Sequence, residues 1–81
     1  IAPMPVTGLT HLRFVLPEAT LVWLDVLDLA GRRVASVLSG AERPAGIETL
    51  TLDTHGWKSG MYLARLRTLT ASVTRRIVVE R

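Results

Sequence analysis

Short segments in which apolar and polar side chains alternate follow one another along almost the whole chain. In Thr20–Asp28, for example, Val22, Leu24 and Val26 would lie on one face of an extended strand. Five further segments read as strands in the same way: His11–Leu16, Arg32–Leu38, Glu48–Asp53, Met61–Arg67 and Val73–Glu80. Turn-forming residues separate them, and no segment has a helical period. The sequence therefore predicts an all-β fold, a small immunoglobulin-like β-sandwich of six to seven antiparallel strands.

The same alternation separates a predicted core from a predicted surface. The apolar side chains expected to point inward are Leu12, Phe14, Leu16, Val22, Leu24, Val26, Val34, Leu50, Leu52, Tyr62, Ala64, Leu66, Ile77 and Val79. Ser39–Gly46 and Thr54–Gly60 are expected to be surface loops, and Thr68–Ala71 should join the last two strands. We expect residues 1–8, which include two prolines, to be a linker remnant and residues 9–81 to form the single domain.

The composition excludes several classes of function. A chain of 81 residues that is 48% hydrophobic can bury one small core and is too apolar for a disordered tail. It has no cysteine, so disulfides and thiolate chemistry are excluded. Its net charge of +3 comes mainly from arginines spread along the sequence, with few aromatic residues, which disfavours nucleic-acid binding. No apolar stretch approaches the ~20 residues of a transmembrane helix, so none is expected.

Residues capable of catalysis or metal binding are few and scattered. His11 and His55 are the only histidines, and a metal site built from Asp53, His55 and a distant residue is disfavoured because no second ligand has a suitable spacing. Asp25 and Asp28 fall on opposite faces of one strand, so they cannot act as paired carboxylates. We therefore predict no catalytic residue, no cofactor-binding residue and no metal site, and a protein that is not an enzyme.

Backbone geometry explains the glycines and one tryptophan. Asp28 and Gly31 take the first and last positions of a four-residue turn, which suits type I. Gly60 gives the chain room to enter its strand. We expect Trp57 to plug one end of the sandwich, and a ligand platform is the alternative.

An apolar patch away from the core is one candidate for contact with other molecules. Leu21, Trp23 and Leu27 share the face of their strand that points away from the core, and Met61 and Leu63 also point outward. These residues predict a docking patch. Alternatively, Trp23 packs against a preceding domain.

The last strand is the second candidate. Arg75 and Arg76 precede Ile77, Val78 and Val79. The strand is either an edge strand protected by charge or one that is recognised through edge pairing.

Five short motifs follow one another in a fixed order: Phe14–Pro17; Leu27 and Asp28 with Gly31, Arg32 and Val34; Gly46–Asp53; Ser59–Tyr62; and Arg75–Val79. In this order and spacing the chain resembles the C-terminal sorting domain of the type IX (Por) secretion system, type A, and is similar to the Ig-like domain of flagellar hook-capping proteins. On this resemblance the motif turn residues are Asp28, Gly31, Arg32, Gly60 and Tyr62, and Arg75–Val79 is the recognition strand. The glycine usual in the last hairpin of the family is absent.

The resemblance implies a non-catalytic secretion-sorting and cell-surface attachment domain of a larger exported protein. Its implied partners are the type IX outer-membrane machinery, a sortase-like protease and the preceding domain of the parent protein. The implied route leads through the periplasm to the cell surface or the extracellular space. The alternative is an Ig-like structural or carbohydrate-contacting accessory module of an extracellular enzyme.

Overall fold

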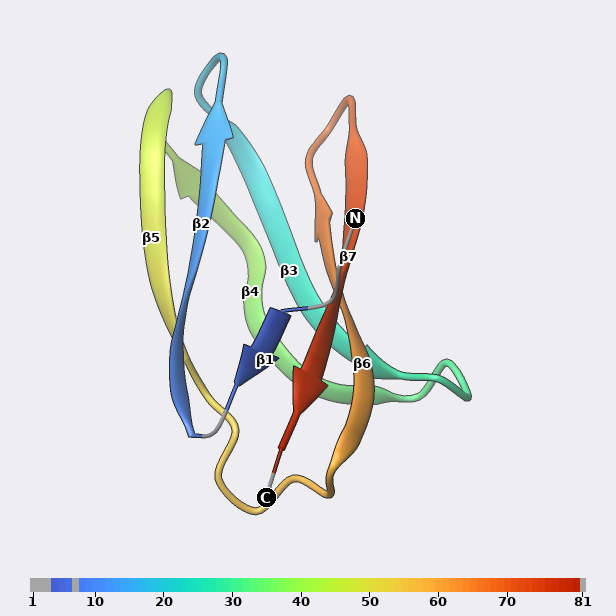
Figure 1. Ribbon diagram of the computed structural model, residues 1–81. Coiled ribbons are helices and arrows are strands. Elements are labelled where there is room, and N and C mark those ends of the chain that lie inside the picture. Colours follow the sequence, from blue (N-terminus) through green and yellow to red (C-terminus); the bar gives the residue numbers. More distant parts are fainter. Residues whose placement is uncertain (1–3, 7, 81) are drawn as a thin grey trace.

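A computed structural model describes residues 4–6 and 8–80, and every regular element in that part of the chain is a strand (Figure 1). The strands are β1 (Met4–Val6), β2 (Leu9–Leu16), β3 (Thr20–Asp28), β4 (Arg33–Arg43), β5 (Gly46–Asp53), β6 (Gly60–Arg67) and β7 (Ser72–Val79). They form a five-stranded sheet in the order β1-β7-β6-β3-β4 and a two-stranded sheet of β2 and β5. All pairings are antiparallel except that of β1 with β7. The predicted all-β fold is confirmed, and the two sheets are compatible with a small Ig-like sandwich.

The core lies between the two sheets. Its central cluster consists of buried side chains from β3, β5, β6 and β7: Val26, Leu52, Tyr62, Ala64, Ile77 and Val79. One predicted inward residue is wrong, because Val34 is 37% exposed. The pairing of β3 with β4 skips Val34, since Val26 pairs with Ala35 and Leu27 with Arg33. Such a bulge reverses which side chains face inward, so Ala35 packs against the core in place of Val34.

The prediction that Ser39–Gly46 is a loop is also wrong. Strand β4 continues to Arg43, which pairs with Thr20, and only two residues separate it from β5. Gly40 makes this continuation possible, because its φ of 67° accommodates a second bulge opposite Trp23. The polar composition is tolerated since β4 is at the edge of its sheet.

The last hairpin turns without glycine. Its connection lies between Arg67 and Ser72, as predicted. The backbone N–H of Thr68 donates to the carbonyl of Ala71 at 2.8 Å. The Thr68 hydroxyl accepts from the N–H groups of Thr70 and Ala71 at 3.3 and 3.1 Å. A threonine side chain therefore supplies the turn chemistry in a hairpin that contains no glycine.

The first described residues are paired with the end of the chain. Met4–Val6, within the stretch predicted to be a linker remnant, forms β1, with Met4 opposite Ile77 and Val6 opposite Val79. Over these residues β7 lies between β6 and β1 (Figure 1). The prediction of an edge strand is therefore wrong for Ile77–Val79.

Candidate functional site

The hairpin between β3 and β4 is organised by the carboxylate of Asp28. The N–H of Gly31 donates to the Asp28 carbonyl at 3.0 Å, as the predicted turn requires, and Gly31 has a φ of 85°. Asp28 Oδ1 accepts from the N–H groups of Ala30 and Arg32, and Oδ2 lies 3.0 Å from Nε of Arg32. The hydrogen bond from the Arg32 N–H is the main reason that the pKa of Asp28 lies below its ordinary value of 3.8. The motif residues Asp28, Gly31 and Arg32 thus form a structural turn.

The motif tyrosine closes one end of the sandwich. Tyr62 is 8% exposed, and its hydroxyl donates to the Lys58 carbonyl at 2.7 Å. A bond from tyrosine to backbone a few residues upstream is also a feature of Ig-type sandwiches. The ring of Trp57 lies 5.1 Å from that of Tyr62 and packs against the core cluster, as predicted for a plug. Sequence reasoning missed the hydroxyl bond because nothing marks Lys58 as its acceptor.

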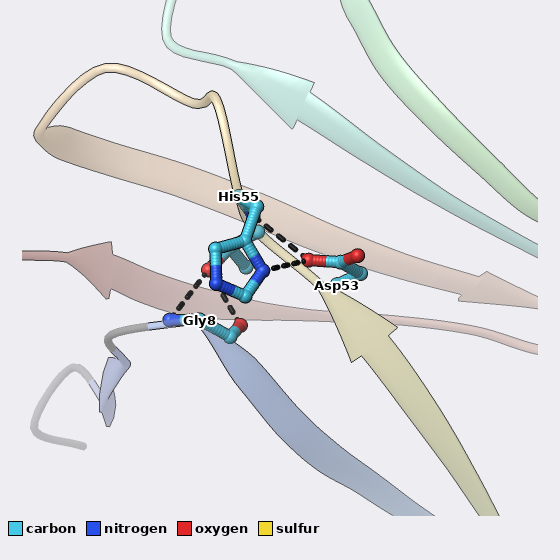
Figure 2. Close-up of polar contacts among 4 residues, drawn as sticks. Gly8, Asp53 and His55 are labelled. Carbon is cyan, nitrogen blue, oxygen red and sulfur yellow. Dashed lines mark hydrogen bonds and ion pairs between the residues drawn. The ribbon is translucent and has the colours of Figure 1, made fainter.

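Asp53 and His55 form a contact on the surface, at the start of the same loop. Figure 2 shows the imidazole of His55 facing the carboxylate of Asp53, with 2.6 Å between Nδ1 and Oδ1. Both side chains are largely exposed. Within residues 4–6 and 8–80, no group of three or more His, Cys, Asp or Glu could hold a metal ion. The pair therefore acts as a local turn contact, in which Oδ1 also accepts the N–H of His55.

Thr54, which lies between these two residues in sequence, is hydrogen-bonded to Gly8, the residue before β2. Its side chain is 0% exposed. The hydroxyl donates to the Gly8 carbonyl at 2.6 Å and accepts from the Gly8 N–H at 3.0 Å (Figure 2). Any side chain at Gly8 would also meet the ring of His55 at 3.4 Å. This buried clamp was not predicted from the sequence.

The candidate docking patch is half-buried. Leu21, Trp23 and Leu27 of β3 are each partly covered. Asp25, on the same face, is only 3% exposed. The patch is therefore interrupted by a buried carboxylate, which the alternation of β3 placed on this face without indicating its burial.

Two arginines of β6 cover that carboxylate. Oδ2 of Asp25 lies 3.3 Å from Nη2 of Arg67 and 3.6 Å from Nη2 of Arg65. The guanidinium carbon of Arg67 also lies 5.8 Å from the centroid of the Trp23 ring, a cation–π contact. The side of the five-stranded sheet that points away from the core therefore combines apolar side chains with the guanidinium groups of Arg65 and Arg67, which both contact the carboxylate of Asp25.

The terminal strand divides its residues between two faces. Ile77 and Val79 are 0% and 1% exposed and belong to the core. Arg75 pairs with the buried Ala64 and so points to the inner side of the sheet. Arg76 pairs with Leu63, which in turn pairs with Leu27, and Val78 pairs with Met61.

Strand order thus brings Arg76 and Val78 onto the same face as the docking patch. We call this surface, made of Trp23, Leu27, Leu63, Arg76 and Val78, the outer face. It does not include the motif turn at Asp28 or the contact between Trp57 and Tyr62. The motif turn residues therefore stabilise the fold, and the candidate contact residues lie on a separate surface.

Other functional features are few in the described part of the chain. It contains no helix that is long and apolar enough to span a membrane. No aromatic side chain there is exposed, and the rings of Trp57 and Tyr62 are tilted by 44°. Among the described residues there is therefore no flat, exposed aromatic platform of the kind that a carbohydrate-contacting module would use.

Comparison with protein-family models matches residues 1–80 to the secretion system C-terminal sorting domain. Comparisons with curated proteins and with solved structures gave no significant match.

Proposed function

The chain belongs to the family of secretion system C-terminal sorting domains, and on that basis we propose that its outer face is the surface that the export machinery reads. The general function, secretion sorting, rests on the family match over residues 1–80. The domain is a secretion-sorting signal of an exported protein, interacts with the type IX machinery, and accompanies its cargo to the cell surface or the extracellular space. A non-catalytic role is consistent with this family.

We propose the following route for the parent protein. It crosses the inner membrane, and this domain folds in the periplasm, where the outer-membrane machinery recognises it. A sortase-like protease then removes the domain and attaches the cargo to the cell surface. The support for these steps is family membership.

The positions of the side chains of β7 support a role for the outer face. Within the recognition strand Arg75–Val79, Ile77 and Val79 are enclosed in the core and Arg75 points to the inner side. Only Arg76 and Val78 lie on the outer face, beside Leu63 and Met61. A partner of the folded domain can contact these two together with the docking patch. Mixed apolar and cationic surfaces of this kind are common in protein interfaces, where arginine and tryptophan are enriched.

A secretion assay with matched charge reversals tests this. A periplasmic reporter carrying the domain at its C-terminus would be expressed in a bacterium with a type IX system, and reporter at the surface or in the medium would be measured. We expect Arg76→Glu to reduce export strongly. Lys58→Glu, an equal charge change on an exposed loop residue, should leave export unchanged. Equal export of both variants would contradict a role for the outer face.

Two controls make this assay interpretable. The unmodified domain must export the reporter, and failure there would contradict the sorting function itself. Each variant must also keep the circular dichroism spectrum of the folded domain. Truncation before Arg75 is a poor test, because it removes the buried Ile77 and Val79 and so unfolds the domain.

A further inference from the structure

A groove lies between the two sheets, on the side opposite to the outer face. It has a volume of about 490 Å³ and lies between β2 and the inner face of β6 and β7. The two-stranded sheet covers only part of the five-stranded sheet, so Leu66 and Val73 remain partly exposed along it. In Figure 1, β5 lies on one side of β2, and β1 and β7 are seen on its other side.

The first feature that identifies an occupant is the edge of β2. Every residue of Leu9–Leu16 pairs with β5, and among the described residues β2 has no second neighbouring strand. The other side of β2 therefore presents a row of backbone N–H and C=O groups that no strand satisfies. Such an edge accepts an extended peptide as an added strand, because the main-chain hydrogen bonds repeat along both chains.

The second feature is the apolar floor beside that edge. Leu12, Phe14, Leu66 and Val73 supply its partly exposed apolar surface, with the buried Leu24 and Ile77 beneath them. A strand that is added to β2 places every second side chain on the side that faces this floor. Apolar residues at those positions would bury their surface in the groove. The remaining residues of the added strand would point away from the floor.

The third feature is the charge of the rim. His11, Arg13 and Arg75 line the groove, and no Asp or Glu among the described residues does. No described carboxylate forms an ion pair with Arg13 or Arg75. Carboxylates on the outward positions of an added strand would lie beside His11 and Arg13, which share that side of β2, and cross-strand pairs of opposite charge are stabilising.

These charges also argue against a second copy of this chain as the occupant. Strand β2 contains His11 and Arg13 but no acidic residue. Antiparallel pairing of two β2 strands would bring the cations of both copies together, and like charges across a strand pair are destabilising.

We propose that the groove binds an extended segment of a partner protein, in which apolar residues alternate with Asp or Glu, as a strand added to β2. This interaction is independent of the sorting function and of the outer face. It uses Arg13 of β2, while the outer face uses Arg76 of β7.

The test uses the whole 81-residue chain, labelled with ¹⁵N, and a capped synthetic peptide of eight alternating valine and glutamate residues. We expect binding with a Kd below about 1 mM, and chemical-shift changes at the amides of Leu9–Leu16 and Val73–Ile77. The corresponding valine–lysine peptide should bind at least about tenfold more weakly. Absence of shifts at β2, or equal binding of both peptides, would overturn the proposal.

Two arginines on different faces of the domain provide matched variants. Arg13→Glu on β2 should weaken binding of the glutamate peptide by about fivefold or more, while Arg76→Glu, with the same net charge on the outer face, should change it less than about twofold. Similar effects of both variants would mean non-specific attraction and reject the groove. Concentration-dependent shifts at β2 without peptide would instead show that a second copy occupies the edge, and would also reject it. Each variant is first checked for an unchanged pattern of amide signals away from the substitution.

Discussion

Replacement of Ile77 by alanine tests whether strand β7 is part of the core. Ile77 is 0% exposed and belongs to the cluster that includes Val26, Tyr62 and Val79. The change removes three carbons, and at ~0.8 kcal/mol per buried CH₂ the lost transfer free energy is about 2.4 kcal/mol. The unfilled cavity raises the expected loss of unfolding free energy to about 3–4 kcal/mol. A domain of 81 residues has about 4–12 kcal/mol in total, so this one side chain carries a large share.

Urea denaturation followed by circular dichroism measures this loss. With a slope of about 1 kcal/mol per M of urea for a small domain, the midpoint should fall by roughly 3 M. The matched control is Val78→Ala, because Val78 is next in sequence, half-buried and on the outer face. Its expected loss is about 1 kcal/mol or less. A midpoint for Ile77→Ala equal to that for Val78→Ala would refute the enclosure of Ile77.

Three further substitutions test single contacts. Thr54→Val should lower the free energy of unfolding by about 2–3 kcal/mol, because it leaves the buried N–H of Gly8 without its acceptor, whereas Thr54→Ser should cost only about 1 kcal/mol in urea denaturation. Tyr62→Phe should cost about 1 kcal/mol in the same assay, since the Lys58 carbonyl loses its donor. The folded-state pKa of Asp28 is lowered, so its stabilising effect is present above pH 3.8 and is lost as the pH falls through the lowered pKa. The thermal midpoint of Asp28→Asn should therefore lie below that of the unmodified domain at neutral pH and approach it in acid; a constant difference would contradict this.

Alternation of side chains predicted the strands and most of the core because both depend on local pattern. It failed at Val34 and along Ser39–Gly46, where bulges occur. A bulge adds one residue to one strand, so every later residue changes face relative to a strict period of two. The polar residues after Ser39 have the composition of a loop, and only their pairing with β3 keeps them extended. Tertiary pairing therefore overrode composition.

The turn at Asp28 was predictable because all of its partners lie within four residues. The outer face was predictable only in part, because the alternation placed Leu27 and Leu63 outward but their neighbours depend on the pairing of β6. Leu27 lies next to Leu63 only because β3 and β6 pair, and Leu63 lies next to Arg76 only because β6 and β7 pair. The burial of Asp25 beneath Arg65 likewise follows from the first of these pairings. Such contacts between residues distant in sequence cannot be deduced from spacing alone.

The burial of the terminal strand limits how a sorting signal of this type can be recognised. If the machinery read Arg75–Val79 as a free peptide, Ile77 and Val79 would have to leave the core first. Because losing these two side chains unfolds the domain, that step costs its whole free energy of unfolding, about 4 kcal/mol at the lower end of the range, and each 1.4 kcal/mol weakens binding tenfold. Recognition of the free strand would thus lose roughly a factor of 10³ in affinity. Contact with Arg76 and Val78 on the folded outer face has no such cost, because both side chains already lie on that face. The free-energy balance therefore favours recognition of the folded domain over recognition of its extended terminal strand.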